Sequence, residues 1–323
     1  MSIKNFRPNW LLAISLGTFI TVASSSCSKD NPTPPSNKIT DKVVADPSLS
    51  LLEKAVVKAG LATTLSGAGP FTVFAPNDSA FSASGLGAAD IDATSADDLK
   101  KILLYHTLGS KVMAAGVPAG PNAKVLTINV PPVAADSIFV TKNAAGVFVN
   151  GIQVTTADVA ADNGVIHVMS RVLLPPTGNI VATAQANVGG DTGLDSLVTA
   201  IVRADAAAPG LITLLNSNIL TVFAPTNKAF RDLLTALNLS KVADIPIATL
   251  QDVLGYHVRA GRAFSSDLTA GPLAMFASGN TTVSLSSGAT IKGNGNPAPS
   301  NIIATNIMAT NGVVHLIDRV LLP

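Results

Sequence analysis

Apolar residues recur along the chain with two different periods, and the helical period comes first. Leu49, Leu52 and Val56 lie three and four positions apart, with Leu65 beyond them, which predicts one apolar stripe on a helix that starts from about Lys38. The same spacing returns later at Leu194, Leu197, Val198 and Ile201, followed by Leu211, Leu214 and Leu215. We therefore predict a helical segment at the start of each of two similar stretches.

Each helical segment leads into a short sequence that occurs twice. FTVFAPNDSAF spans residues 71–81 and LTVFAPTNKAF spans residues 220–230, with 7 of the 11 positions identical. The strand-forming residues of 71–75 predict a strand that stops at a proline, because proline has no amide hydrogen to donate. Asn77 and Thr226 follow the prolines and suit a helix N-cap. We expect a structural role for Thr72, Phe74, Pro76 and Phe81 and for their counterparts Thr221, Phe223, Pro225 and Phe230.

A further helix ends in Tyr-His in both stretches. LKKILLYH covers residues 99–106 and LQDVLGYH covers residues 250–257. The first, fourth, fifth and eighth positions of each share one helical face. His106 and His257 therefore lie at the end of an apolar stripe.

The later part of each stretch changes to the period of two that is typical of strands. Apolar residues alternate around an Asn150-Gly151 turn, at Ile138, Val140, Val147, Val149, Ile152 and Val154, and the second copy has Val283, Leu285 and Ile291 in this part. Each copy closes on a second signature, NGVIHVMSRVLLP at 163–175 and NGVVHLIDRVLLP at 311–323, with 9 of 13 positions identical. We expect its histidines, His167 and His315, to be structural.

The two signatures recur at offsets of 149 and 148 residues, so the chain contains one domain twice with almost no net insertion. Such an offset exceeds the roughly 20 to 50 residues of solenoid repeats. We predict two α+β domains, domain 1 at 38–175 and domain 2 at 181–323, joined by a short linker at 176–180.

Three ordered motifs, each present twice, resemble those of the fasciclin-like domain family: T-V-F-A-P-[TN]-x-x-A-F, Y-H and N-G-V-[IV]-H-V-[ILM]-x-x-V-L-L-P. The resemblance covers residues 38–323 and implies that each domain is a wedge of two β-sheets packed against several helices. Domain 1 departs from the pattern at Met169-Ser170, where domain 2 keeps Ile317-Asp318. A contact made by that aspartate is therefore in doubt in domain 1.

The amino terminus has the layout of a secretory signal, with Lys4 and Arg7 before an uncharged run at 10–23. Cys27, the only cysteine, resembles the lipidated residue of bacterial lipoproteins, where two acyl chains suffice for stable anchoring. We predict a lipoprotein signal at 1–27, a proline-rich tether at 28–37 and a protein anchored in the outer membrane and exposed at the cell surface. The alternative is an ordinary signal with an incidental cysteine.

Composition excludes some partners. Apolar residues make up 47% of the 323 residues and charged residues 13%, which is typical of folded, core-rich domains. Loss of Lys4 and Arg7 with the signal changes the formal net charge from +1 to −1. A near-neutral protein lacks the basic surface of a nucleic-acid binder, so no nucleic-acid partner is expected.

The sequence contains no recognisable catalytic or metal-binding pattern. The four histidines form two equivalent pairs, but no nearby cysteine or His-x-x-x-His supplies further zinc ligands. No Gly-x-Ser-x-Gly elbow or phosphate-binding glycine loop occurs in a supporting context. Asp90, Asp92, Asp97 and Asp98 lack the spacing of a calcium loop and suit a helix N-terminus. We therefore expect no enzyme activity, no metal and no cofactor.

The Tyr-His segments are the candidate interaction residues. In animal relatives this segment is linked to integrin binding, so the resemblance implies a possible role for Tyr105, His106, Tyr256 and His257, and core packing is the other interpretation. Our leading hypothesis is an adhesion protein that binds other cells, matrix proteins or surface polymers, with protein or polysaccharide ligands and a membrane anchor. The alternative is an envelope or periplasmic binding protein for a small molecule, lipid or glycan, which a sizeable apolar pocket would favour.

Overall fold

The computed structural model describes residues 36–128, 137–277, 279–286 and 288–323. Cys27 and most of the proposed tether lie outside the described residues, so the signal and the anchor stay predictions. Within the described ranges, no single helix is long and apolar enough to cross a membrane. Helices α8 (Asp195–Ala207) and α9 (Leu211–Ser217) meet that requirement only as a pair bent by 117°.

Domain 1 begins with several short helices in place of the single stripe predicted up to Leu65. They are α1 (Ile39–Ala45), α2 (Ser50–Lys58) and α3 (Ala62–Leu65). Pro47 starts a 3₁₀ turn between the first two, and Gly60, at φ 68°, adopts a left-handed conformation between the last two. The prediction of one continuous helix was therefore wrong in length, although Leu52 and Val56 are buried as expected.

The first signature folds as the sequence predicts. Strand β1 (Phe71–Pro76) leads into α4 (Asp78–Ala83), where the Asn77 side chain accepts from the Ala80 amide at 2.8 Å. In domain 2, Thr226 accepts from the Ala229 amide at 3.3 Å. Both predicted N-caps are confirmed. Helices α5 (Ala88–Ala93) and α6 (Ala96–Tyr105) follow, and His106 is the C-cap of α6.

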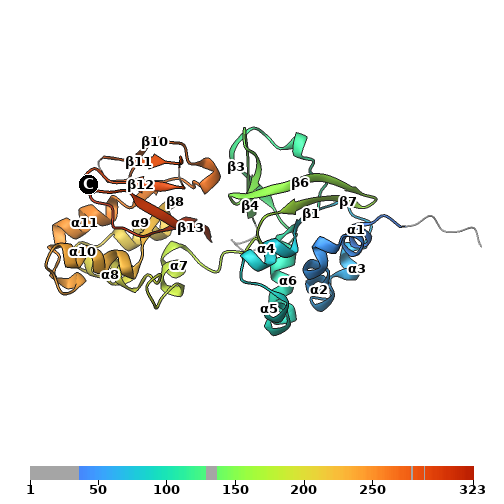
Figure 1. Cartoon of the computed structure of the whole chain (residues 1–323), viewed down its shortest axis with the longest axis horizontal. Helices are drawn as coiled ribbons and strands as arrows, with labels where there is room; N and C mark the ends of the chain where they lie inside the picture. The colour runs from blue at the N-terminus through green and yellow to red at the C-terminus, as the bar shows by residue number, and fades with distance from the viewer. Residues whose placement is uncertain (1–35, 129–136, 278, 287) are drawn as a thin grey trace, which may run out of the picture. The chain divides into compact units, whose positions relative to one another are not determined.

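The strands of domain 1 form a seven-stranded sheet with the order β2-β1-β7-β6-β5-β4-β3. After β2 (Thr107–Leu108), they are β3 (Gly120–Leu126), β4 (Ser137–Asn143), β5 (Gly146–Val149), β6 (Ile152–Ala161) and β7 (Gly164–Met169). The start of β6 pairs with β5 and the rest of it pairs with β7, so β6 joins the two parts of the wedge. Helices α1 to α6 lie together on one side of these strands (Figure 1).

The two signatures of each domain lie side by side in the sheet. Strand β1 runs parallel to β7, with Phe71 opposite Gly164 and Phe74 opposite His167. A Cβ on Gly164 would lie 2.1 Å from the Phe71 carbonyl oxygen, so only glycine permits this approach. In domain 2 a Cβ on Gly312 would lie at the same 2.1 Å from the Leu220 carbonyl oxygen.

Domain 2 repeats this architecture with the sheet order β10-β11-β12-β13-β14-β8-β9. Its further elements are α7 (Ile180–Ala186), β8 (Leu220–Pro225), α10 (Asn227–Ala236), α11 (Ile247–Gly255), β9 (Val258–Ala260), β10 (Gly271–Ala274), β11 (Asn280–Ser284), β12 (Thr290–Lys292), β13 (Ser300–Ala309) and β14 (Gly312–Ile317). Leu285 follows β11 and is 43% exposed, so its predicted place in a strand was wrong.

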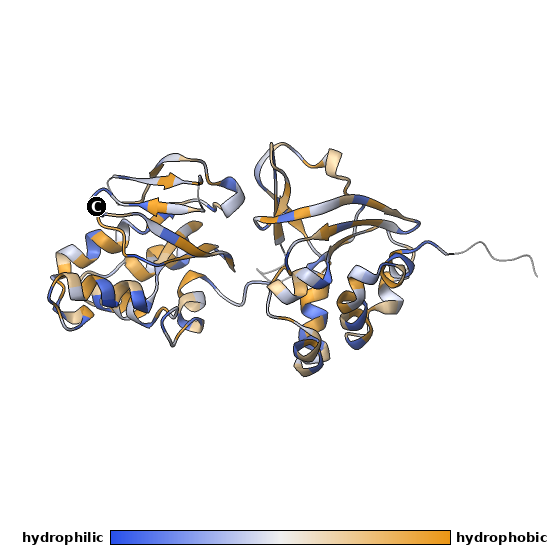
Figure 2. Ribbon diagram, viewed as in Figure 1, coloured by the Kyte–Doolittle hydropathy of each residue, from blue (hydrophilic) through white to orange (hydrophobic). Residues whose placement is uncertain are grey.

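Each domain has two apolar clusters, because successive residues of the central strand point to opposite faces. In domain 1, Val73 and Ala75 pack against the helices, whereas Phe74 packs with Tyr105 and Ile138 beneath the later strands. Hydrophobic and hydrophilic residues alternate along both kinds of element (Figure 2). The predicted α+β fold is confirmed.

Candidate functional site

The Tyr-His segment of domain 1 is a buried joint between α6 and the end of the domain. His106 is 1% exposed, and its Nδ1 lies 2.8 Å from the Ile102 carbonyl oxygen, one helical turn earlier. Its Nε2 accepts from the Leu173 amide at 2.8 Å. Since Nε2 is the acceptor, the proton must be on Nδ1, which donates to Ile102. The neutral ring thus connects the helix to the closing signature.

His257 of domain 2 makes the same pair of contacts. Its Nδ1 lies 2.7 Å from the Val253 carbonyl oxygen and its Nε2 accepts from the Leu321 amide at 2.9 Å. Burial lowers the pKa of His106 and of His257 to about 4, because the charged ring would lose its hydration. Both rings are therefore neutral at physiological pH.

The histidines of the closing signature use the opposite tautomer. The Asp158 amide donates to Nδ1 of His167 at 3.2 Å, and the Asn306 amide donates to Nδ1 of His315 at 3.4 Å. Their Nε2 atoms donate to the carbonyl oxygens of Val112, at 2.8 Å, and Ala263, at 2.9 Å. Each ring also stacks on a phenylalanine of the first signature: the ring centroids are 5.5 Å apart for Phe74 and His167 and 5.4 Å apart for Phe223 and His315.

Asp158 and Asn306 are equivalent residues that the sequence interpretation missed. Both have positive φ, 62° and 64°, at register shifts in β6 and β13. Their side chains accept from the amides of Ala114, at 2.9 Å, and Ser265, at 2.8 Å. Asp and Asn tolerate the left-handed region better than other side chains, but the two types differ, so no shared letter marks this position.

The threonines of the first signature fix the loop after the Tyr-His segment. The Thr72 hydroxyl donates to the Ser110 carbonyl oxygen at 2.6 Å and accepts from the Val112 amide at 2.8 Å. Thr221 makes the equivalent bonds in domain 2 to Gly261, at 2.7 Å, and from Ala263, at 2.9 Å. Both threonines have no exposed surface, so each hydroxyl depends on these backbone groups for its hydrogen bonds.

The tyrosines beside the histidines are also fully buried. The Tyr105 hydroxyl donates to the Ser137 carbonyl oxygen at 2.9 Å and accepts from the Asn150 side chain at 3.0 Å. Burial raises the pKa of Tyr105 to about 12, and the bond from Asn150 opposes that rise. Tyr256 donates to the Asn280 carbonyl oxygen in domain 2.

Asn163 and Asn311 have a role that we did not assign from the sequence. The Asn163 side chain accepts from the Ile39 amide at 2.9 Å and donates to the carbonyl oxygens of Leu65 and Gly67, both at 2.8 Å. Asn311 accepts from the Ile180 amide at 2.9 Å and donates to Leu215 at 2.7 Å. Both closing signatures begin with this asparagine, and that repetition was the feature of the sequence that could have indicated the role. Each asparagine ties the first helix of its domain to the last hairpin.

The two closing signatures differ at Ser170 and Asp318, and this difference changes one side-chain contact. Asp318 accepts from the Asn301 amide at 2.8 Å and from the Ser300 hydroxyl at 3.1 Å, which holds the start of β13. Ser170 stands at this place in domain 1, where its backbone amide bonds to the Gln153 carbonyl oxygen at 3.1 Å. The aspartate contact thus belongs to domain 2.

These contacts limit the chemistry that the signature residues can perform. Every ring nitrogen of the four histidines has a backbone partner, so none presents a free lone pair to a substrate. In the part of the chain that the structure describes, no group of three or more His, Cys, Asp or Glu side chains could hold a metal ion. The interaction role of the Tyr-His segments stays a prediction, but their four side chains are at most 2% exposed.

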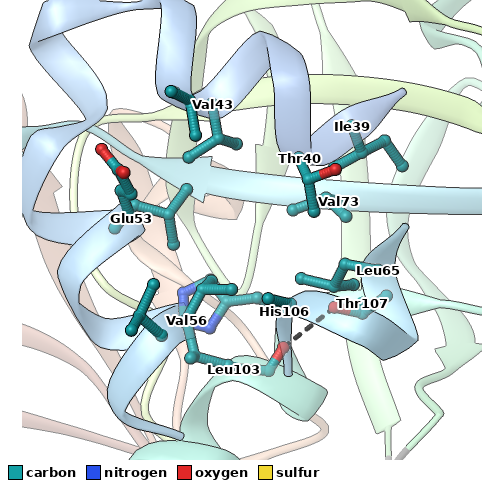
Figure 3. A pocket seen from close by; sticks show the side chains of 14 residues that line it. Ile39, Thr40, Val43, Glu53, Val56, Leu65, Val73, Leu103, His106 and Thr107 are labelled. Atoms are coloured by element: carbon teal, nitrogen blue, oxygen red, sulfur yellow. Dashed lines mark hydrogen bonds between the residues drawn. The ribbon is translucent and has the colours of Figure 1, made fainter. Parts of the chain in front are cut away.

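Domain 1 contains an apolar cavity of about 70 Å³ between its first helices and β1. Figure 3 shows its wall, with Val56 and Leu103 on one side and Ile39, Leu65 and Val73 on another. The Thr107 hydroxyl donates to the Leu103 carbonyl oxygen at 2.9 Å, so the hydroxyl does not require a ligand (Figure 3). Val44 and Val57 also line the cavity and are 62% and 65% exposed, so the cavity reaches the surface.

Domain 2 has a smaller cavity at the equivalent place. Its volume is about 20 Å³, and its wall includes Ile201 and Leu211 on α8 and α9. Domain 1 has Val56 on α2 where domain 2 has Ile201. Ala62 on α3 corresponds to Ile212, which packs against the domain 2 core. Both side chains are larger in domain 2, where the cavity is smaller.

Curated proteins from several kingdoms are similar to this chain. Protein sll1483 of Synechocystis sp. is 38% identical over 140 residues, which are 43% of this chain and 73% of that protein. Transforming growth factor-beta-induced protein ig-h3 of Sus scrofa is 35% identical over 144 residues, 45% of this chain and 20% of that protein. Periostin of Homo sapiens is 28% identical over 269 residues, 80% of this chain and 29% of that protein. The matches thus span less than a third of the two animal proteins.

One solved structure and one family description complete the comparison. A FAS1 domain pair from the insect cell adhesion molecule Fasciclin I aligns with 88% of this chain and 96% of its own chain, at 18% sequence identity and a TM-score of 0.39. The protein family described as Fasciclin domain matches this chain twice, at residues 47–175 and at residues 196–323. Two matches that together cover most of the chain, each containing both signatures, show that this protein belongs to the fasciclin domain family, with two domains in tandem.

Proposed function

We propose that this protein is a cell-surface interaction protein whose two fasciclin domains bind other cells, matrix proteins or surface polysaccharides. The observation that carries the proposal is the burial of the repeated signature residues, whose polar groups are bonded to the backbone inside each domain. Residues used in this way hold the module together. Recognition then falls to exposed faces and loops, which the two copies share less closely.

Family membership supports an adhesive role, because fasciclin domains are found in cell adhesion proteins. The duplication adds a physical argument. When one domain binds a surface, the second domain is held near it at a raised effective concentration, so two weak contacts give a much stronger attachment. Adhesion to a surface with many copies of a ligand benefits from this arrangement.

The anchor belongs to the same proposal. An acylated Cys27 would hold the protein in the outer membrane, and the proline-rich residues 28–37 would extend domain 1 from the lipid surface. A binding module displayed in this way meets ligands outside the cell.

Protease treatment of intact cells tests exposure, and binding to cells, matrix proteins and glycans tests adhesion. We expect loss of the protein from intact cells under a protease that leaves a periplasmic marker uncut, and we expect Cys27→Ala to move it to the soluble fraction. Protection of the protein on intact cells would overturn surface display. Absence of binding by the two-domain protein and by membranes that carry it would overturn adhesion.

A second candidate function is favoured by the cavity of domain 1. An apolar cavity that opens at the surface suits a binding protein for a small apolar molecule or lipid in the cell envelope. Binding of such a ligand does not require contact with another cell, so the two candidates are tested by separate measurements.

A further inference from the structure

We propose that the cavity of domain 1 binds the end of a linear, saturated hydrocarbon chain, such as the acyl chain of a lipid with an uncharged headgroup. This inference deepens the second candidate function and rests on it, and it is independent of adhesion. The cavity lies between α1, α2, α3, α6 and β1, within one domain (Figure 3).

The wall of the cavity selects an apolar ligand. Aliphatic side chains make up most of it, and the His106 imidazole is its only ring. Both nitrogens of His106 bond to the backbone, at Ile102 and Leu173, and the Thr107 hydroxyl bonds to Leu103. A polar ligand would therefore lose its hydration without gaining partners from these groups.

The rim extends the apolar surface outward. Val44 on α1 and Val57 on α2 are both more than 60% exposed, although they line the same cavity. A chain that continues out of the cavity would cover these side chains and remove them from water.

Charge at the rim argues for an uncharged headgroup. Glu53 is the one carboxylate in the lining, and its carboxylate points away from the cavity centre (Figure 3). The neighbouring Lys54 is paired with Asp92 at 2.7 Å, and the Lys58 amine donates to the Asp92 carbonyl oxygen at 2.5 Å. A fatty-acid carboxylate at the mouth would therefore meet the charge of Glu53 with these two lysines already bonded.

The fold itself does not require this empty space. Domain 2 has the same helices around the same strand, and its cavity of about 20 Å³ has Ile201 in the wall where domain 1 has Val56. Well-packed interiors contain few voids larger than a water molecule, because unfilled space loses dispersion contacts. A domain that keeps Val56 and Ala62 where its own copy has larger residues retains a cavity that a simple substitution could fill.

Titration of residues 28–323, which contain every described residue and no cysteine, with 1-alkanols from butanol to decanol tests the proposal. Amide chemical shifts in nuclear magnetic resonance spectra report the site. We expect saturable shifts confined to α1, α2, α3, α6 and β1, and an affinity that rises about fourfold per added methylene until the cavity is full. Decanoate should bind more weakly than decanol. Shifts that do not saturate, or an affinity independent of chain length, would overturn the proposal.

Variants that copy domain 2 provide the matched test. The double change Val56→Ile with Ala62→Ile copies Ile201 and Ile212 of domain 2, so it fills the cavity with residues that the same fold accepts, and should weaken decanol binding at least tenfold. The control, Ile201→Val with Ile212→Ala in domain 2, should leave domain 1 binding unchanged. The exposed change Val44→Gln, which copies Gln185 of α7 and leaves the core intact, should weaken it several-fold. Unchanged affinity in both domain 1 variants would show that the alkanol binds elsewhere and would refute the site.

Discussion

Acid should destabilise both domains through the histidines that follow the two tyrosines. In the folded protein, His106 accepts the Leu173 amide on Nε2, and protonation of that nitrogen would break the bond and place a charge in the core. The unfolded chain has no such restriction and binds the proton with the ordinary pKa of 6.5. Because the folded pKa is lowered to about 4, the unfolded state binds more protons between these values.

The sign and size follow from that difference. The stabilising effect of a neutral His106 is fully present above the unfolded pKa and is lost as the pH falls toward the folded pKa. Between about pH 7.5 and pH 5, linkage makes this one histidine responsible for a loss of about 2 kcal/mol in the free energy of unfolding. His257, with the same pair of bonds and the same lowered pKa, should contribute a similar loss in domain 2.

Two measurements check this reasoning. Nitrogen chemical shifts of the imidazoles should show His106 and His257 protonated on Nδ1 at neutral pH and not titrating above about pH 5. Urea unfolding at both pH values should show a smaller pH dependence for the domain 1 transition in His106→Gln than in the wild type, and the domain 2 transition of the same sample is the internal control. A folded-state titration of His106 with its midpoint near the ordinary value would refute the argument, whether or not the variant folds.

Three other substitutions test the contacts between the signatures. Gly164→Ala places a methyl group 2.1 Å from the Phe71 carbonyl oxygen, so calorimetry should show domain 1 destabilised by about 3 kcal/mol or more, whereas Gly116→Ala, with open space around it and no positive φ, is the control for glycine replacement. Thr72→Val keeps the shape but removes the side-chain partner of the Val112 amide and of the Ser110 carbonyl oxygen, and urea unfolding should show a loss of about 1 to 3 kcal/mol. Tyr105→Phe removes the hydroxyl that bonds to Asn150, and a loss under about 0.5 kcal/mol would contradict the importance of that bond.

Much of the fold was predictable because each local pattern occurs twice. The strand at Phe71, the N-caps at Asn77 and Thr226 and the Asn150-Gly151 turn all follow from residues near them in the chain. Periodicity could not reveal the break between α2 and α3 at Gly60, because the apolar spacing continues across it from Leu49 to Leu65. Leu285 was misplaced because alternation of apolar residues continues past the end of β11.

The candidate site depended on contacts that no local pattern contains. The parallel pairing of β1 with β7 brings Phe74 beside His167, although the two lie more than 90 positions apart in the chain. Asn163 was visible as a repeated residue, but its three bonds to the first helices depend on tertiary packing. The cavity of domain 1 could not be predicted from the sequence, because its wall combines residues of several helices and a strand that only the fold brings together.

The pairing of β1 with β7 also sets the order in which each domain can be completed. The central strand is made early, but its parallel neighbour begins at Gly164, roughly 90 residues after Phe71. At a synthesis rate of about 5 to 20 residues per second, the first strand waits on the order of 5 to 20 seconds for its partner. During that time its β7-facing edge is unpaired and can pair with the wrong chain. In domain 2 the Leu321 amide that holds His257 lies four residues after the partner strand β14, so His257 gains this partner only after β14 has been made.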